Sequence, residues 1–311
     1  MWWGCIEVHE GCDHCYARTF DKRVGGDHWG AKQPRRAVAD VWNEFKKWQK
    51  KAAKAGEVHR VFVGSMMDIF ERSQPCVDYY GKPLEVTTGE LRQRFFDEVV
   101  PNSPNLLFLL LTKRPQNITK MVPAAWLENP PANVMYGTSV VNQVTADRDI
   151  PVLLKVPGKR FLSIEPLLGS VDLTGHLDIC GKCGKGIVNH AFDDRCKWFE
   201  NGIHWVIVGG ESGHHARPMH PDWARSLRDQ CVAAGVAFHF KQWGEWLPIA
   251  QDVNRIASQQ QDEGKHWTSK TFHNFTDGKT SVKVGKKAAG RLLDGRTWDQ
   301  FPQEITNNLE D

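Results

Sequence analysis

The sequence has no apolar run close to the roughly 18 residues that a membrane-spanning helix needs, which excludes helical integral membrane proteins. Its opening residues, MWWGC, lack the charged and apolar regions of a secretory signal peptide. It also contains no internal repeat and no low-complexity block. These absences predict a protein of the cytoplasm, where thiols stay reduced.

An excess of charge of one sign is also missing. The chain has 40 Lys and Arg against 37 Asp and Glu, and a net charge of +3 is too small to predict a polyanionic partner by itself. With 311 residues, 41% of them hydrophobic, the composition is that of a globular protein of one large domain or two ordinary ones. Eight cysteines in a reducing compartment favour metal binding or catalysis over disulfides. Cys76 and Cys231 stand alone in the sequence and are predicted to be packing thiols.

Six short apolar runs predict strands that are covered on both faces, because they are continuous rather than alternating. Each run ends in glycine or a polar residue. Helical patterns lie over residues 38–52, 90–100 and 221–235, and the last opens with proline and closes with glycine. The six runs are VFVGS (61–65), LLFLLLTKR (106–114), VMYGTSV (134–140), RFLSIEP (160–166), WVIVGGESG (205–213) and VAFHFKQW (236–243).

This alternation of strands and helices predicts an α/β fold with a parallel sheet, as a partial or complete (β/α) TIM-like barrel. Residues 1–250 are expected to form the barrel domain, including a Cys-rich insert at 176–203, and residues 251–311 a basic C-terminal extension. In barrels, chemistry gathers at the C-terminal ends of the strands. The polar residues at these ends, a predicted ligand-binding rim, are Ser65, Asp68, Thr112, Lys113, Arg114, Thr138, Ser139, Ser163, Glu165, Glu211, Lys241 and Gln242.

The strongest motif is the stretch CIEVHEGCDHCYARTF, in which Cys5, Cys12 and Cys15 form a C-x6-C-x2-C pattern. Three thiolates on one loop suit a [4Fe–4S] cluster in which one iron has no protein ligand. A zinc site is the alternative from spacing alone, with His9 or His14 as the fourth ligand. Coincidence remains a third reading of the pattern.

Seven segments, the first of them part of this cysteine stretch, together carry a resemblance to a known family. The chain resembles the phage-associated radical S-adenosylmethionine (SAM) family known for its three-cysteine motif, and the resemblance runs from the cysteine loop nearly to the C-terminus. The commonest superfamily spacing is C-x3-C-x2-C with an aromatic before the last cysteine, whereas this chain has six residues in the first gap and His14 in that place. The matching segments are GCDHCYARTF, VFVGSMMDIF, LTKRP, FLSIEPLLG, VIVGGESG with ARPMHPDW, FKQWGEW and VGKKAAGRLLDGRTWDQFP.

The resemblance implies a [4Fe–4S] cluster on Cys5, Cys12 and Cys15, with SAM chelating the open iron. Reductive cleavage of SAM by an electron donor would yield a 5′-deoxyadenosyl radical that abstracts hydrogen, while the protein orients the reactants. The implied contacts are Ser65 and Asp68 near the SAM amino group, Thr138 and Ser139 near its ribose or carboxylate, and Gly209, Gly210 and Glu211 near the adenine.

A second cysteine group lies in the insert. Cys180, Cys183 and Cys196, with His190 between them, have the spacing of a Cys3His structural zinc site. An auxiliary iron–sulfur cluster and free thiols are the alternatives.

Basic residues point to a nucleic-acid partner. Lys279, Lys283, Lys286, Lys287 and Arg291 fall within thirteen residues that contain no acid, and a lysine-rich face covers residues 46–54. Lysine runs are often only solvated surface, but as phosphate contacts they would give salt-sensitive DNA binding. The 13 tryptophans could include a stacking platform for a flipped base, although most are expected in the core.

The resemblance implies a substrate in phage DNA, in the host cytoplasm, where relatives are implicated in thymidine hypermodification that evades host restriction. The predicted reaction is isomerisation of an N-linked aminoacyl-thymidine, most simply Nα-glycyl-thymidine, to its Cα-linked form. Lys113, Arg114 and Lys241 are candidates for holding a substrate carboxylate or phosphate. Glu165 is a candidate for an amine or hydroxyl, because a buried carboxylate needs a partner.

Two other functions compete with this one. The first keeps the radical chemistry but repairs DNA lesions in the manner of a photoproduct lyase. The second is a non-catalytic, zinc-stabilised nucleic-acid-binding protein. Metal content separates the second from both enzymes.

Overall fold

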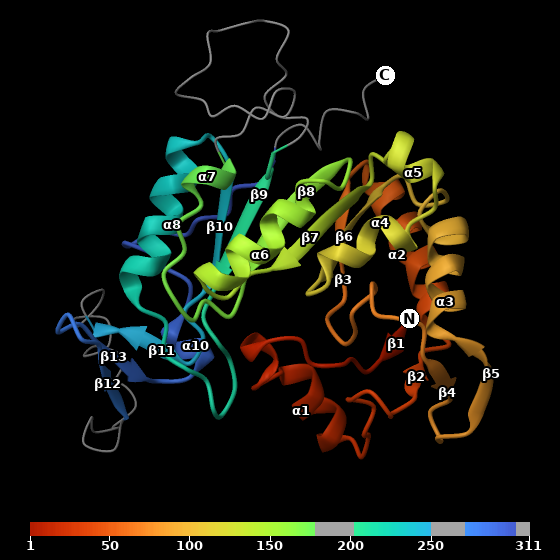
Figure 1. Ribbon diagram of the computed structural model, residues 1–311, viewed down its shortest axis with the longest axis horizontal. Helices are drawn as coiled ribbons and strands as arrows, with labels where there is room; N and C mark the ends of the chain where they lie inside the picture. Colours follow the sequence, from red (N-terminus) through yellow and green to blue (C-terminus); the bar gives the residue numbers. More distant parts are fainter. Residues whose placement is uncertain (178–201, 250–270, 303–311) are drawn as a thin grey trace, which may run out of the picture.

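The computed structural model describes residues 1–177, 202–249 and 271–302. Its centre is a six-stranded sheet in the order β10-β9-β8-β7-β6-β3, in which all neighbouring strands are parallel. The sheet curls into a half barrel (Figure 1), so the prediction of an α/β fold with a partial (β/α) barrel is confirmed. These strands are β3 (His59–Val63), β6 (Leu106–Thr112), β7 (Val134–Ser139), β8 (Lys159–Ile164), β9 (Trp205–Gly209) and β10 (Ala237–Gln242).

All six predicted strands therefore exist, each within a few residues of its apolar run. The predicted helices are present too: α2 (Val41–Ala55) ends at Gly56 in the left-handed conformation, and α8 (Pro221–Ala233) begins with proline. The helix predicted over residues 90–100 is divided into α3 (Thr88–Arg94) and the π-helical turn η2 (Phe95–Val99). A capping box between Thr87 and Glu90 begins α3.

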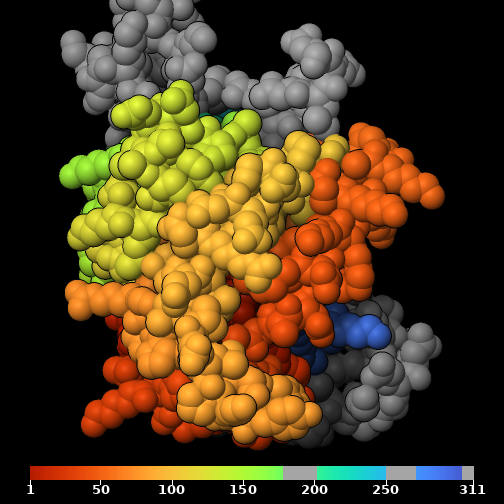
Figure 2. Space-filling model, turned by 90° about the vertical axis from the view of Figure 1, so that its right-hand side faces the viewer, coloured from red at the N-terminus to blue at the C-terminus, as the bar shows by residue number. Residues whose placement is uncertain are grey.

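Smaller elements connect the strands. Between β6 and β7 lie η3 (Pro115–Asn117), α4 (Ile118–Met121) and α5 (Ala125–Glu128), between β7 and β8 lies α6 (Gln143–Leu153), and α7 (Thr174–Leu177) follows β8. Figure 2 shows that the segments carrying α2, α3 and α5 form one continuous surface over their side of the molecule. No helix of the described residues has the length and apolarity to cross a bilayer.

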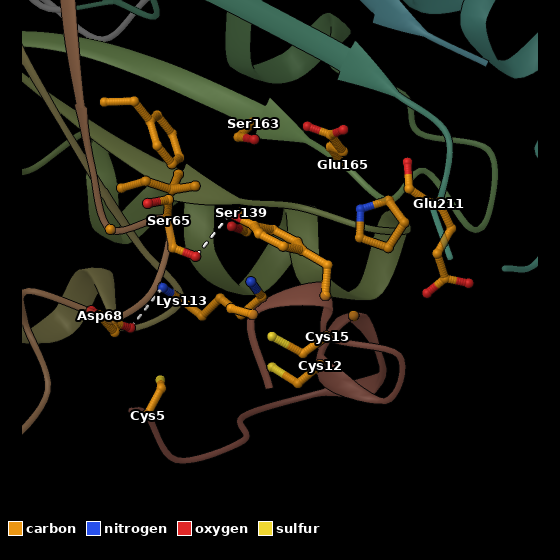
Figure 3. Close-up of a pocket in the computed structure, with 18 of the residues that line it drawn as sticks. Cys5, Cys12, Cys15, Ser65, Asp68, Lys113, Ser139, Ser163, Glu165 and Glu211 are labelled. Atoms are coloured by element: carbon orange, nitrogen blue, oxygen red, sulfur yellow. Dashed lines mark hydrogen bonds between the residues drawn. The ribbon is translucent and has the colours of Figure 1, made fainter. Parts of the chain in front are cut away.

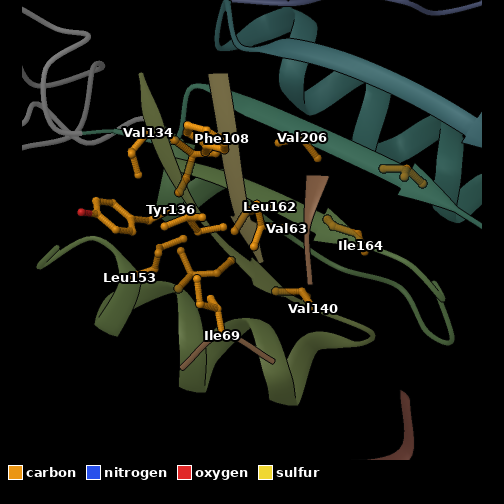
Figure 4. Packing of buried hydrophobic residues seen from close by; sticks show 14 of the residues in the cluster. Val63, Ile69, Phe108, Val134, Tyr136, Val140, Leu153, Leu162, Ile164 and Val206 are labelled. Atoms are coloured by element: carbon orange, nitrogen blue, oxygen red, sulfur yellow. The ribbon is translucent and has the colours of Figure 1, made fainter. Parts of the chain in front are cut away.

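The hydrophobic core lies between the helices and the convex face of the sheet. Figure 4 shows Phe108 and Tyr136 on neighbouring strands, with Leu153 of α6 and Ile69 packed over them. Alternate residues of the same strands point to the concave face, where a smaller cluster contains Leu107, Leu109, Met135, Phe161 and Trp205. The concave side is thus filled at one end of the strands only.

Two small sheets flank the half barrel. The first has the order β1-β2-β4-β5 and consists of β1 (Trp2–Trp3), β2 (Arg35–Ala37), β4 (Pro75–Val77) and β5 (Pro83–Thr87). The second has the order β11-β13-β12 and consists of β11 (Trp246–Pro248), β12 (Phe272–Asn274) and β13 (Thr280–Lys283). Short η1 (Glu10–Cys12), α1 (Tyr16–Arg23) and α10 (Lys286–Ala289) complete the described chain.

The described C-terminal residues pack against the half barrel. The backbone N–H of Phe240 donates to the carbonyl of Trp298 at 2.9 Å, and that of Trp243 donates to Gly290 at 3.1 Å. β13 pairs with β11, which follows β10 directly. The predicted division at residue 250 remains a prediction, but residues 271–302 are close enough to contribute to a site on the barrel.

Candidate active site

One cavity of about 760 Å³ lies at the C-terminal ends of the six parallel strands. The loop that carries the three early cysteines forms its opposite wall. The cysteines and the residues at the strand ends therefore face the same cavity (Figure 3). Of the predicted site residues, those that line this cavity are Cys5, Cys12, Cys15, Ser65, Asp68, Thr112, Lys113, Ser139, Ser163, Glu165, Gly210, Glu211, Lys241 and Gln242.

The cysteine loop has a fixed local structure. Cys5 follows β1, Cys12 ends η1 and Cys15 is the residue before α1. The imidazole of His9 caps η1 by accepting from the N–H of Gly11 at 3.1 Å. A Cβ atom on Gly11 would lie 2.6 Å from a methyl group of Val141, so only glycine lets the loop pass this close to the sheet.

The three thiols form no disulfide in the described residues. Burial, together with the negative charge of Asp68, raises the pKa of the Cys5 thiol to about 12, while the nearby Arg114 opposes this shift. The guanidinium of Arg114 lies 3.8 Å from the Cys5 sulfur. Cys5 is therefore a neutral thiol unless a cation replaces its proton.

Asp68 fixes Arg114 in this position. One carboxylate oxygen accepts from the Arg114 guanidinium at 2.6 Å and the Lys113 N–H at 3.2 Å. The other accepts from the Thr112 hydroxyl at 2.7 Å and the Phe70 N–H at 3.0 Å. Asp68 lines the cavity, but four donors already saturate its carboxylate. Arg114 also donates to the Ile6 carbonyl at 2.6 Å, so it lies behind the loop and holds it.

Glu211 anchors the other side of the loop. Its carboxylate accepts from the side chain of Arg217 at 2.6 and 2.9 Å, from the Arg217 N–H at 2.7 Å, and lies 3.2 Å from His14. Burial opposes ionisation, but the hydrogen bonds from Arg217 and His14 keep the pKa of Glu211 below its usual value. Arg217 in turn donates to the Glu10 carbonyl at 2.9 Å and reaches Asp13 at 3.3 Å. We call Glu211 and Arg217 the latch.

A third polar group lies on the wall formed by β8 and β10. The Glu165 carboxylate accepts from the Lys241 ammonium at 2.7 Å and from the Gln242 amide at 3.0 Å. Lys241 is half exposed to the cavity, whereas Glu165 is more deeply placed. Because solvent already reaches Lys241, a substrate could replace this ion pair. The carboxylate of the substrate would bind Lys241 and its ammonium group would bind Glu165.

Ser139 is the clearest unfilled donor in the cavity wall. Its hydroxyl is buried, lines the cavity and has no hydrogen-bond partner in the described residues. Ser65, just after the end of β3, also lines the cavity, and its carbonyl accepts from the Tyr16 hydroxyl at 2.8 Å. Buried hydroxyls are normally satisfied, so an unpaired one in a cavity wall fits a bound ligand.

The structure does not bring Thr138 and Gly209 to the cavity lining. Thr138 alternates with Ser139 on β7, so it faces the other side of the sheet and donates to the carbonyl of Thr112 at 3.2 Å. A Cβ on Gly210 would lie 2.0 Å from the carbonyl oxygen of Trp243. Glycine is required at 210 by the chain's own backbone.

The second cysteine group, Cys180, Cys183, His190 and Cys196, lies outside the described residues. Within them, the only three metal-ligating atoms within 4.8 Å of one another belong to His220, Asp222 and Asp277. The Lys279 ammonium lies 2.6 Å from Asp277 and 2.7 Å from Asp222, so a cation already occupies that group.

Sequence reasoning missed Arg217 and Tyr16. The available signal for Arg217 was a charge of opposite sign six residues after Glu211, in a loop rich in glycine and histidine. Tyr16 directly follows Cys15, yet its hydroxyl reaches residue 65, and no sequence pattern encodes that contact.

A family model described as a protein of unknown function (DUF5131) matches residues 1–302. The chain belongs to the DUF5131 family. No curated protein and no solved structure matches it. Every residue that lines the cavity of this DUF5131 protein, from Cys5 to Lys286, falls within the matched range.

Proposed function

We propose that this DUF5131 protein is a radical-SAM enzyme of the phage-associated three-cysteine-motif family. Cys5, Cys12 and Cys15 would hold a [4Fe–4S] cluster, and SAM would bind beside it in the cavity. The observation that carries the proposal is the convergence of three free cysteine thiols on a cavity at the C-terminal ends of a parallel half barrel.

The early cysteines and their neighbouring histidines do not form a compact zinc site in the described residues. Sulfurs around a tetrahedral zinc lie about 3.8 Å apart, given a Zn–S bond of about 2.3 Å. No three ligand atoms from the cysteines and from His9 and His14 lie within 4.8 Å of one another in the described chain. A polynuclear cluster takes ligands that are spread more widely than those of one zinc ion, so the lack of such a compact group does not count against a cluster.

The cavity also fits a polar cofactor beside the cysteines. The unpaired Ser139 hydroxyl and the exposed Ser65 give hydrogen-bonding groups on two neighbouring sides, and the volume of about 760 Å³ suits a ligand plus part of a substrate. When bound, the cluster and SAM would supply a one-electron reduction and an adenosyl radical able to abstract hydrogen.

The chain's own residues position the reactants. Arg114 and the latch fix the cysteine loop from both sides. Glu165 and Lys241 offer opposite charges to a substrate ammonium and carboxylate. An aminoacyl group linked to thymine carries these functions, so the pair fits an Nα-glycyl-thymidine whose linkage moves from nitrogen to the α-carbon. This reaction is an isomerisation, in which all atoms of the substrate are retained.

Anaerobic purification followed by iron, sulfide and zinc analysis tests the cofactor. We expect brown protein with broad absorption at about 400 nm and about four irons and four sulfides per chain, apart from metal in the second cysteine group. Cys12→Ser and Cys15→Ser should lose this cluster, whereas Cys76→Ser, a buried thiol away from the cavity, should keep it. Colourless protein with zinc alone would contradict the proposal.

The substrate needs a separate test. The reconstituted enzyme is incubated with SAM, dithionite and DNA that contains Nα-glycyl-thymidine, and the DNA is digested to nucleosides for mass spectrometry. We expect a new nucleoside with the same mass as the substrate. In this nucleoside the glycine is linked through its α-carbon, so treatments that cleave the N-linked glycine should not release it. Unchanged nucleosides together with release of 5′-deoxyadenosine would exclude this substrate but not the radical-SAM assignment.

A further inference from the structure

The charges around the cavity do not balance. Each carboxylate that lines it already has a cationic partner among the described residues, so none is left to neutralise another cation. The four pairs are Glu7 with Arg18, Asp68 with Arg114, Glu165 with Lys241, and Glu211 with Arg217.

Two lysines in the same lining have no such partner. The ammonium groups of Lys113 and Lys286 make no hydrogen bond or ion pair in the described residues. Figure 3 shows the Lys113 side chain between Asp68 and Cys15, beside the cysteine loop. Lys286 is more exposed and comes from α10, a segment far away in the sequence. The cavity therefore carries two uncompensated positive charges on separate elements.

The backbone holds Lys286 at the cavity. The N–H groups of Val284 and Gly285 donate to the Glu245 carbonyl at 3.0 and 3.1 Å, and Ala289, the last residue of α10, is buried. Lys287 is the next residue, is also exposed, and does not line the cavity.

The rest of the basic segment is engaged elsewhere. Lys279 pairs with Asp222 and Asp277, Lys283 donates to the carbonyl of His214, and Arg291 pairs with Asp299. Of the basic residues that suggested a polyanion in the sequence, Lys286 is thus the one that remains free and faces the cavity.

We propose that Lys286 and Lys113 bind phosphate oxygens of a nucleic-acid strand whose target base enters the cavity. The inference rests on the proposed function, because it takes the cavity as the substrate site. Two separated ammonium groups fit a chain that carries one negative charge per nucleotide better than they fit a zwitterionic amino acid. β3 and β10 are the two edge strands of the sheet, and Phe62 of β3 lies in the cavity lining. There the 45%-exposed ring of Phe62 offers a stacking face for a base.

Binding of a fluorescein-labelled single-stranded oligothymidylate to the full-length protein, followed by anisotropy over a range of salt concentrations, tests this. Lys286→Met and Lys113→Met should each weaken binding by about three- to tenfold at low salt. Each should also reduce the slope of log affinity against log salt by about 0.7, the value for one phosphate contact on a single strand. Lys287→Met is the matched control and should bind as the wild type does.

Two results would overturn the inference: Lys286→Met binding like the wild type, or Lys287→Met losing as much affinity as Lys286→Met. Competition identifies the recognised group, since thymidine 5′-monophosphate should displace the probe at lower concentration than thymidine or glycine does. If glycine competed as well as thymidine 5′-monophosphate, the group bound by the lysines would be a carboxylate and not a phosphate, which would contradict the proposal. These measurements need no cluster, so lysine-dependent DNA binding by protein that never assembles iron would reject the radical-SAM function and leave this inference intact.

Discussion

The two faces of the six-stranded sheet are made from alternate residues of the same strands, yet they have different roles. On β6, Leu106, Phe108 and Leu110 point into the helix-covered core, whereas Leu107 and Leu109 belong to the small concave cluster. Beyond this cluster, toward the C-terminal strand ends, the concave side opens into the polar cavity.

The difference lies in how each face satisfies its groups. The convex face buries apolar side chains against helices and needs no ligand to be complete. Within the part of the chain that the structure describes, the cavity face contains a buried hydroxyl without a partner on Ser139 and two lysines without counter-charges. Polar groups without partners are expected where a binding site lies on a stable scaffold, because a ligand supplies the missing partners. Substitutions on the two faces should therefore separate stability from function.

The largest contrast should come from two phenylalanines. Phe108 is fully buried and packs its ring against Phe45 and Phe95 with centroids 5.9 and 5.0 Å away, so Phe108→Ala should lower the free energy of unfolding by about 3–5 kcal/mol. Phe62 is 45% exposed on the cavity side, so Phe62→Ala should change it by less than about 0.5 kcal/mol. Urea unfolding followed by circular dichroism measures both.

The same pair sharpens the functional side of the comparison. Phe62→Ala should weaken oligothymidylate binding even though stability is kept, because a stacked base would lose its aromatic face. Destabilisation by Phe62→Ala comparable to that by Phe108→Ala would mean that the cavity face supports the fold as strongly as the core does.

The fold was accessible from the sequence because hydrophobic periodicity and strand-end residues report local structure. The runs near 61, 106, 134, 160, 205 and 236 became the six strands in chain order, and sequential order is the rule in such sheets. The two flanking sheets were not foreseen, because their strands have only two to five residues and some of them, such as β1 with β2 and β11 with β13, pair across more than 30 residues of chain.

The site was accessible in part for the same reason. Polar residues at strand ends were expected to share one edge, and the structure places most of them around one cavity. Thr138 faces away from the cavity because successive side chains of a strand point to opposite faces of the sheet. The sequence prediction treated Thr138 and Ser139 as one motif and did not apply this alternation. The latch between Glu211 and Arg217 depends on loop conformation, which no periodicity encodes.

Removing Arg217 should loosen the cysteine loop without affecting the core. Its guanidinium joins β9's C-terminal end to Glu10 and Asp13, so Arg217→Ala should lower iron retention against a chelator by about tenfold, equivalent to about 1.4 kcal/mol. Arg217→Lys should retain part of the effect, because lysine keeps the charge but cannot bind Glu211 bidentately.

A second readout identifies Arg217 as a positioning residue. Amide hydrogen exchange in residues 5–15 should quicken in Arg217→Ala, while exchange in β6 should not change. Arg225→Ala is the control, because Arg225 pairs with Asp222 and Asp294 away from the cavity. Slow exchange in the loop of Arg217→Ala would show that Arg114 and η1 hold it unaided.

The smallest effect should come from a carboxylate that serves only the scaffold. Asp294 accepts from Arg225 at 2.9 Å and from Arg228, which ties a C-terminal turn to α8. Although partial burial opposes ionisation, the two arginines lower the pKa of Asp294 below its unfolded value of about 3.8. The ionised form is favoured in the folded state, so this stabilisation is complete above that value and is lost as pH falls through the folded pKa.

Asp294→Asn isolates this contribution, because asparagine tolerates the left-handed backbone at this position (φ 53°) but carries no charge. The wild type should exceed the variant in unfolding free energy by about 0.2–1 kcal/mol at pH 5–8, since solvent screens these partly exposed pairs. The difference should shrink below pH 4. Asp97→Asn, whose carboxylate accepts from Gln93 on an exposed helical surface, controls for general charge effects. A gap between wild type and Asp294→Asn that widened on acidification would show that the arginines do not stabilise the charged form.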